Sequence, residues 1–278
     1  MRQTARELKL SFFPFAFQLL LFFTPLILIV VVSFKKSTVF GDVTSEWSLE
    51  SFRQVFELNS VLLFFKTLNF ALISTVICLA ISIPVAWYMS QASKAMQRLL
   101  LVLIVFPFWT SFLIRIYAWK VILHPEGFLK KILFSLGFVS ANETLLYRPE
   151  AVILVLVYIH LPFAIIPLYV AFEKFDKRLL EASRDLGASF LLSFFSVVLP
   201  SVSRALITAS ILVFIPAFGS YIVPDLVGGA SGSMIGNTIA DKVFLERNLP
   251  LASAFSTVLS LLILIPTLSL FKSEKGNA

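Results

Sequence analysis

The sequence predicts an all-α integral membrane protein with six transmembrane helices. Hydrophobic residues make up 58% of the 278 residues and charged residues only 14%. The apolar residues also gather into uninterrupted runs. A hydrocarbon core about 30 Å thick needs roughly 20 helical residues, which is the length of these runs. Because a membrane barrel would instead show short segments of alternating polarity, the continuous runs favour helices.

Four of the expected spans contain no charged residue and at most one histidine. They cover residues 11–34, 67–93, 151–172 and 248–271. The third span in chain order begins at Leu99 and meets Arg115 before it reaches full length, so Arg115 and Lys120 are expected in the membrane interface. The fifth span is expected from Pro200 to about Ala217, because proline suits the first turn of a helix.

Lys and Arg residues indicate the orientation of these spans. They are about twice as dense in one alternate set of connecting segments as in the other, which places the denser set in the cytoplasm. The cytoplasmic set is 1–10, 90–98, 173–190 and 272–278. Both termini are therefore expected inside the cell. This bias and contact with anionic membrane lipid account for the net charge of +7, so no nucleic-acid partner is predicted.

Several classes of chemistry are not supported. The single cysteine, Cys78, lies in the middle of a span and excludes an intramolecular disulfide. His124 and His160 are far apart in sequence and lack an acidic or cysteine cluster, so no metal site is predicted. His160 is expected to pack between helices or to line a cavity. The chain also lacks a phosphate-binding loop of the G-x-x-x-x-G-K-[ST] type, which predicts that it is not an enzyme and binds no cofactor itself.

The segment after the fourth span predicts a short cytoplasmic helix. Asp176 can cap the N-terminus of a helix over 177–186, and Gly187 can end it in a left-handed turn. One face is apolar or small, and it consists of Leu179, Ala182, Ser183 and Leu186. The other faces mix acidic and basic residues, as suits a helix in a protein groove. A surface helix lying on lipid headgroups is the alternative, although it would be more basic.

This segment resembles the EAA loop of type I ABC importer permeases. In that family the pattern is Glu-Ala-Ala, three residues, Gly, nine residues, Ile, any residue, Leu-Pro. This chain differs only at Ser183 and Val197. The resemblance implies that the short helix enters a cleft of an ATP-binding subunit and couples nucleotide to transport. The residues carried over to this role are Glu181, Ala182, Ser183, Asp185, Gly187, Leu199 and Pro200.

Other stretches are similar to spermidine/putrescine permease subunits of the PotB type. They are FPFWTSFLIRIYAWKVIL, LPFAIIPLY and VPDLVGGASGSMIGNTI. The resemblance implies the type I permease fold in a bacterial inner membrane. It implies a sister permease, two ATP-binding subunits that hold ATP and Mg, and an extracytoplasmic solute-binding protein. It also implies a first helix and outer loop over 1–60 and a core over 61–272, with the coupling loop at 173–200.

A route for a polyamine should offer aromatic faces and a few carboxylates without a deep trap. The candidate residues are Trp109, Tyr158, Tyr221 and Asp225. Each has a plainer interpretation, as an aromatic at the membrane interface or, for Asp225, as a solvated loop residue. Arg115 would repel a polycation and is expected away from the route.

Three alternatives differ in solute or mechanism. The same machine could carry another small solute. An ion-driven secondary transporter would normally place acidic residues inside its spans, and these spans have none. An intramembrane serine protease is suggested only by the short pattern Gly229 to Gly232, which lies in an outer loop and is followed by no histidine.

Overall fold

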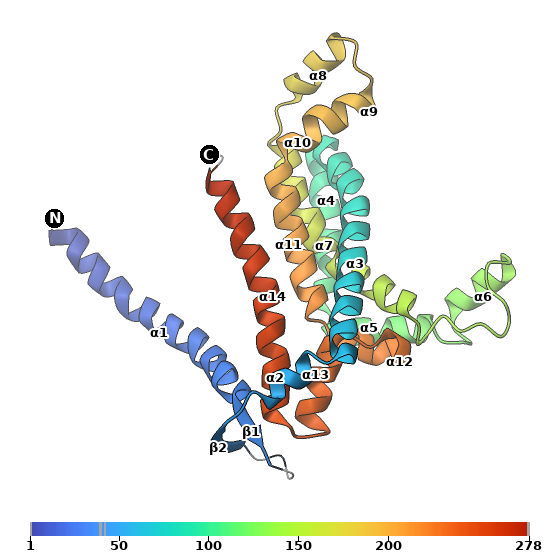
Figure 1. Ribbon diagram of the computed structural model, residues 1–278. Helices are drawn as coiled ribbons and strands as arrows, with labels where there is room; N and C mark the ends of the chain where they lie inside the picture. Colours follow the sequence, from blue (N-terminus) through green and yellow to red (C-terminus); the bar gives the residue numbers. More distant parts are fainter. Residues whose placement is uncertain (1, 39–40, 42, 277–278) are drawn as a thin grey trace. The chain divides into compact units, whose positions relative to one another are not determined.

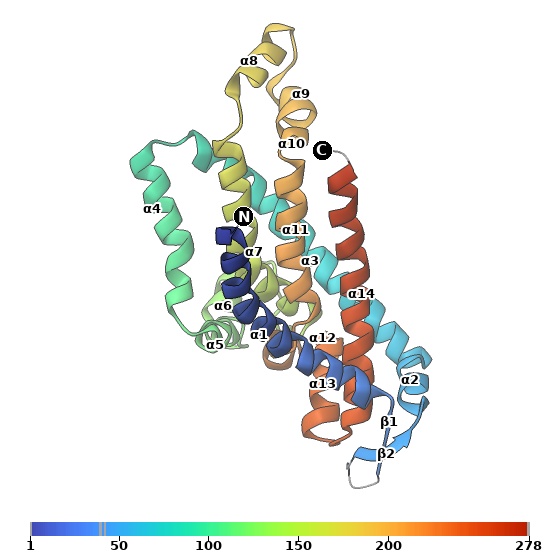
Figure 2. The same ribbon diagram turned by 90° about the vertical axis from the view of Figure 1, so that its left-hand side faces the viewer.

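The computed structural model describes residues 2–38, 41 and 43–276, with side-chain positions for 14–38, 41 and 43–265. These residues are mainly helical and form two compact units. One unit contains the described residues up to Leu63 and those from Thr238 onward, and the other contains Phe64–Asn237. Figure 1 and Figure 2 show the helices from two directions.

The first unit is built from helices that begin and end the described chain, with a small hairpin between them. Helix α14 contacts α1, α2 and β1. The elements are α1 (Arg2–Ser33), β1 (Lys35–Ser37), β2 (Val43–Trp47), α2 (Glu50–Val55), the end of α13 (Ile235–Phe244) and α14 (Leu249–Gly276).

The hairpin is an addition to the predicted all-helical fold. Strands β1 and β2 pair antiparallel. The side chain of Lys35 in β1 contacts two residues of β2. Its Nζ donates a 2.8 Å hydrogen bond to the Ser45 carbonyl and lies 3.7 Å from the centroid of the Trp47 ring. Residues such as Val43 and Trp47 have high strand propensity. The predicted fold rests on long apolar runs, so it did not include this short polar segment between two of them.

The second unit is a helical bundle organised around α7 (Pro149–Glu173), which packs most extensively against α11 (Ser203–Phe218). The elements before α7 are α3 (Leu58–Gln91) from Phe64 onward, α4 (Lys94–Val105), η1 (Phe106–Trp109), α5 (Phe112–Ile122) and α6 (Phe128–Ser135). Those after it are α8 (Lys177–Asp185), α9 (Phe190–Ser193), η2 (Phe194–Val198), α10 (Leu199–Ser201), α11, η3 (Pro224–Gly228) and α12 (Gly229–Gly232).

The predicted spans correspond to helices or pairs of helices. Single helices long and apolar enough to cross a membrane are Pro14–Ser33, Leu58–Gln91 and Pro149–Glu173. Two further candidates are bent pairs, Lys94–Trp109 with Phe112–Ile122 and Phe190–Ser201 with Ser203–Phe218. The last predicted span corresponds to α14, whose apolar part with described side chains covers Leu249–Ile265.

Helix α7 is apolar on every side, and neighbouring elements bury about half of it. Val155, Leu156 and Leu168 are completely buried, and the same helix contributes to two hydrophobic clusters. One cluster lies toward α8 and the other toward α5 and η3. The Cys78 thiol is free and buried, and its Sγ donates to the Val157 carbonyl at 3.5 Å. The rest of α7 exposes apolar side chains, among them Leu154 and Phe163, as suits a helix that contacts lipid. With no polar face, α7 reads as a continuous apolar run.

Candidate functional site

The predicted short helix is present as α8 and has a defined signal at each end. The Asp176 side chain accepts a 3.0 Å hydrogen bond from the Arg178 N–H at its start. At its end Gly187 has a φ of +90°, and its N–H donates to the Arg184 carbonyl. The Ala188 N–H donates to the Ser183 carbonyl. This is the Schellman arrangement, which glycine adopts without the steric cost of a side chain. Both predicted boundary residues are confirmed.

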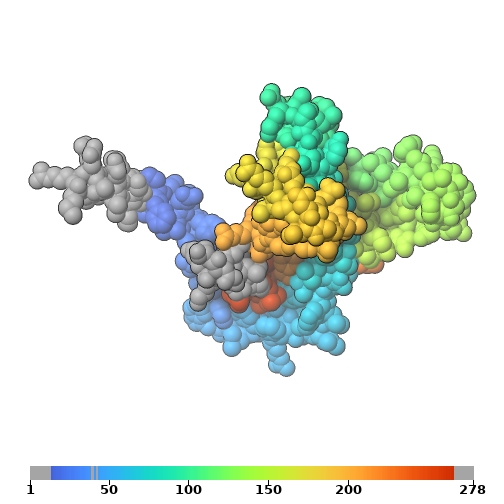
Figure 3. Space-filling view, turned by 90° about the horizontal axis from the view of Figure 1, so that it is seen from above, coloured from blue at the N-terminus to red at the C-terminus, as the bar shows by residue number. Residues whose placement is uncertain are grey.

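Helix α8 projects from one end of the second unit (Figure 1). The space-filling view along the bundle shows α8 and α9 as a raised feature (Figure 3). None of the side chains of α8, all of which are described, is buried. Glu181, Ala182 and Asp185 are exposed, and Leu186 directly after the helix is 89% exposed. The helix therefore presents both apolar and charged side chains to whatever lies beyond the bundle.

The contacts that α8 makes with its own chain differ from the predicted apolar face. Leu180 packs against the hydrophobic cluster below, and Ser183 is half-buried, whereas Leu179 is 51% exposed. The Ser183 hydroxyl donates a 2.9 Å hydrogen bond to the Ser193 hydroxyl on α9. The inward face is thus rotated by about one residue from the predicted one. Ser183, a departure from the family pattern, supplies a specific link that sequence reasoning did not reveal.

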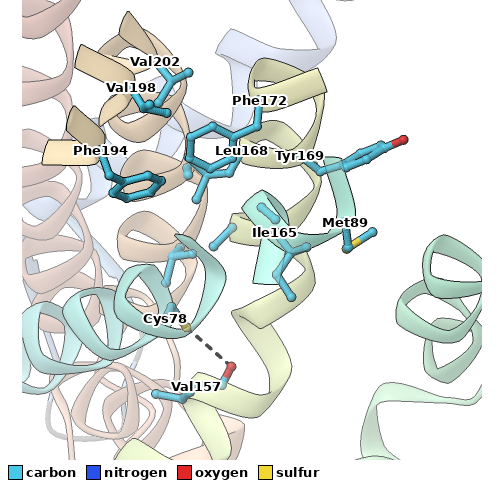
Figure 4. Packing of buried hydrophobic residues seen from close by; sticks show 14 residues of the cluster. Cys78, Met89, Val157, Ile165, Leu168, Tyr169, Phe172, Phe194, Val198 and Val202 are labelled. Carbon is cyan, nitrogen blue, oxygen red and sulfur yellow. Dashed lines mark hydrogen bonds between the residues drawn. The ribbon is translucent and has the colours of Figure 1, made fainter. Parts of the chain in front are cut away.

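The return segment connects α8 to the core of the bundle. Ser189 caps α9 by accepting a hydrogen bond from the Leu192 N–H at 3.3 Å. Phe194 in η2 then packs edge-on against Trp87 of α3, with ring centroids 5.3 Å apart, and lies 6.3 Å from the Phe172 ring of α7. Figure 4 shows Phe194 beside Phe172 and Val198 in this cluster. Displacement of α8 would therefore reach two long helices through one aromatic side chain.

Leu199 and Pro200 lie at a change of helical register. The Leu199 N–H donates to the carbonyl of Phe194, five residues earlier, so η2 is a π-helical turn. Pro200 has no N–H to donate, and such wide turns accommodate a missing donor. The chain then bends by 73° between Phe190–Ser201 and Ser203–Phe218. The regular fifth-span helix begins at Ser203, not at Pro200 as predicted, because Val202 leaves the helical conformation.

The predicted solute-route residues do not form one cluster. Trp109 is 82% exposed at the end of η1, and Asp225 is exposed in η3. Tyr158 packs edge-on against Trp119, with ring centroids 5.3 Å apart. Tyr221 alone of the four lines a cavity of about 550 Å³. The Tyr221 carbonyl accepts from the Asp225 N–H, which links those two residues only through the backbone.

This cavity lies between η1, α5, α7 and α11 and is mostly apolar. Its aromatic walls are Phe108, Phe112, Phe163 and Tyr221. His160 also lines it, as one of the two roles expected for it, and its Nδ1 lies 2.8 Å from the Leu156 carbonyl. Arg115 lines the cavity too. The 93° bend between η1 and α5 brings it there.

The wall of the cavity at Tyr221 is held by a close backbone contact. The Asn237 side chain donates a 3.0 Å hydrogen bond to the Tyr221 carbonyl, and its Oδ1 accepts from the Met234 N–H. A Cβ at Gly236 would lie 2.6 Å from the Ser220 carbonyl oxygen, so only glycine fits there. The Gly-rich stretch in the sequence indicates a close backbone approach in this region, but it does not indicate that Ser220 and Tyr221 are the residues approached.

Comparison with known proteins assigns the chain to a family. The profile of the family described as "Binding-protein-dependent transport system inner membrane component" matches residues 63–272. The chain belongs to this family. The permease fold is therefore shown, and α8 and the segment through Pro200 lie inside the matched region.

Two relatives and a solved structure resemble this permease along most of its length. It is 39% identical over 261 residues to the spermidine/putrescine transport system permease protein PotB of Haemophilus influenzae, covering 93% of this chain and 91% of that protein. It is 37% identical over 241 residues to PotB of Escherichia coli, covering 87% and 88%. A bacterial ABC transporter involved in import of alginate has a TM-score of 0.72 at 16% identity, covering 95% of both chains.

Proposed function

We propose that this permease is the channel-forming subunit of an ATP-driven importer for spermidine and putrescine. The solute assignment is supported by the identity with two PotB proteins over roughly nine-tenths of each chain. The long aligned regions include the spans as well as the loops. The same machine with another small solute is the alternative, and the experiment below separates the two.

The observation that carries the coupling mechanism is the exposure of α8. No side chain of this capped helix is fully buried, and the exposed side chains of Ala182 and of Leu186 directly after it would be stabilised by burial against a partner. Glu181 and Asp185 flank that apolar patch and would pair with groups at the rim of a cleft. Gly187 allows the sharp exit, and Leu199 with Pro200 joins the return segment to the fifth span.

The proposed assembly contains this permease, a sister permease, two ATP-binding subunits and an extracytoplasmic solute-binding protein. Family membership as a binding-protein-dependent component supports the last of these. ATP and Mg belong to the ATP-binding subunits. We place both termini and α8 on the cytoplasmic side, residues 61–272 in the core and 173–200 in the coupling loop. Trp109, Tyr158, Tyr221 and Asp225 remain the predicted solute contacts.

The experiment is transport by the purified complex in proteoliposomes. Uptake of radiolabelled spermidine should require ATP and the binding protein, and excess putrescine should compete with it. If the complex took up a different solute with ATP, and spermidine did not inhibit that uptake, the ATP-driven mechanism would be supported and the polyamine assignment refuted. Uptake by this chain alone on an ion gradient would refute the mechanism.

A further inference from the structure

Arg115 occupies an aromatic site inside the cavity of the second unit. Its guanidinium carbon lies 4.7 Å from the centroid of the Phe108 ring and 6.0 Å from that of Phe112. Phe108 in turn packs edge-on against Phe163, with centroids 5.4 Å apart. A cation within about 6 Å of an aromatic face is attracted by the negative charge density of the ring. These rings therefore form a cation site, and Arg115 fills it.

The site offers Arg115 no anion. Among the described residues that line the cavity none is acidic, and the buried Nε of Arg115 has no hydrogen-bond partner in the described part of the chain. Arg115 also takes part in none of the four ion pairs of the described residues. The Arg115 side chain is half-buried, and a polar atom removed from solvent, as this Nε is, normally has a hydrogen-bond partner. Here the aromatic faces are its main support, so a competing cation can displace it.

We propose that this cavity is a cation-binding site for alkylammonium groups of the solute and that Arg115 is its tethered occupant in the solute-free protein. The inference rests on the proposed polyamine function. Like charges exclude one another at this separation, so an entering ammonium group must push the guanidinium aside. Return of the guanidinium expels the solute again. A site of this kind binds a polycation without becoming a trap.

The surrounding geometry suits such an exchange. Phe112 and Arg115 are three residues apart on α5 and share one face, whereas Phe108 lies beyond the 93° bend. The wall at Tyr221 is held by the hydrogen bond from Asn237. A volume of about 550 Å³ lies within the usual range of small-molecule sites. The long Arg115 side chain is the part of the site that can move without unfolding a helix.

The test measures cation binding to the detergent-solubilised complex by thermal shift, with methylguanidinium and spermidine as probes. Arg115→Ala should vacate the site, so methylguanidinium should stabilise this variant and have no comparable effect on the wild type. Arg115→Gln serves as a second neutral variant, and Arg115→Lys should retain an occupant and behave as the wild type. Lys120→Ala is the matched control, because Lys120 is on α5 but faces the Tyr147 ring, 5.9 Å away.

A second substitution separates aromatic binding from pairing with an acid of a partner subunit. Phe108→Ala in the Arg115→Ala background should weaken methylguanidinium binding about tenfold, the loss expected for one aromatic face. No methylguanidinium effect in either neutral variant, an equal effect in the wild type, or an effect insensitive to Phe108→Ala would overturn the proposal.

Transport distinguishes failure of this inference from failure of the proposed function. In the neutral variants the spermidine concentration that gives half-maximal uptake should fall. Spermidine should also cross the membrane in the absence of ATP. If the wild type carries spermidine and these variants show neither change, the tethered-occupant inference fails alone. If the wild type carries no polyamine while methylguanidinium still binds the neutral variants, the solute assignment fails and the cation site stands.

Discussion

The Ser183 hydroxyl donates a 2.9 Å hydrogen bond to the Ser193 hydroxyl, which joins the exposed helix α8 to the segment that returns into the bundle. Ser193 is completely buried, whereas Ser183 is only half-buried. The bond therefore links a surface element to the core. Together with the packing of Leu180 on the cluster that contains Phe194, it connects α8 to the bundle.

Removing one partner of this hydrogen bond should cost more than removing both. Ser183→Ala should lower the free energy of unfolding by about 1–3 kcal/mol because the buried Ser193 hydroxyl loses its partner, and Ser193→Ala in that background should recover part of the loss. Thermal unfolding of the two single variants and the double variant gives the cycle. Strictly additive losses would contradict a direct contribution from this bond. Uptake should continue in Ser183→Ala, since the change restores the family pattern.

Gly187→Pro should block uptake while the complex stays assembled in the membrane. Proline fixes φ near −65° and has no N–H, so it removes both the left-handed turn at φ +90° and the bond to the Arg184 carbonyl. The measurement is ATP-dependent uptake with the amount of assembled complex determined in parallel.

Gly137→Pro is a matched control for that variant. Gly137 ends α6 with a φ of +76°, and its N–H donates to the Phe134 carbonyl in the same type of turn. Helix α6 lies well away from α8 (Figure 1). Uptake should survive Gly137→Pro. If both variants lost uptake equally, the loss in Gly187→Pro would reflect disrupted folding at a helix end and not a role of Gly187 in coupling.

Phe194→Ala should disrupt the connection between the return segment and the bundle. Phe194 is 8% exposed and packs against Trp87, so its truncation should destabilise the protein by about 3–5 kcal/mol. Phe194→Leu should retain most of the stability but lower the number of solute molecules carried per ATP. Phe195 is 63% exposed, and Phe195→Ala should change neither quantity appreciably. Normal transport by Phe194→Ala would exclude this side chain from the coupling route.

The loop that precedes α7 should lose an ion pair in acid. Arg148 Nη1 donates a 2.6 Å hydrogen bond to Glu143 Oε1, and this bond lowers the pKa of the Glu143 carboxyl below its ordinary value of 4.5. A carboxyl with a lowered pKa in the folded state stabilises it above the unfolded-state pKa. That contribution is lost as the pH falls through the folded-state pKa. The wild type should therefore be more stable than Glu143→Gln at neutral pH and lose this extra stability below about pH 4.5.

Thermal unfolding at neutral pH and at successively lower pH checks this sign. Glu126→Gln is the control, because Glu126 takes part in none of the ion pairs of the described residues. If the stability of the wild type relative to Glu143→Gln increased as the pH fell, the stabilising role of the Arg148–Glu143 ion pair would be contradicted.

The sequence predicted those features that depend on local chemistry. Asp176 and Gly187 were identified as ends of α8 because a side-chain acceptor and a left-handed residue act within one turn. The spans followed from uncharged length, which a bilayer requires of any single helix.

The features that the sequence did not predict depend on contacts between distant residues. The serine at 183 gave no indication that its partner is Ser193, because a hydroxyl accepts many partners. The contact of Arg115 with Phe108 depends on the bend between η1 and α5, which no local sequence signal indicates. The start of the fifth span was placed at Pro200 from its proline, whereas the π-helical turn before it shifts the bend to Val202.

Cysteine cross-linking from the tip of α8 tests the central claim most directly. With the buried Cys78 replaced by serine, Leu186→Cys places a thiol at an 89% exposed position, and Leu136→Cys places one after α6 at a 62% exposed position. In the assembled complex Leu186→Cys should cross-link to the ATP-binding subunit, with a yield that changes on addition of ATP, and Leu136→Cys should not. Absence of that cross-link in a complex that transports solute would contradict the account.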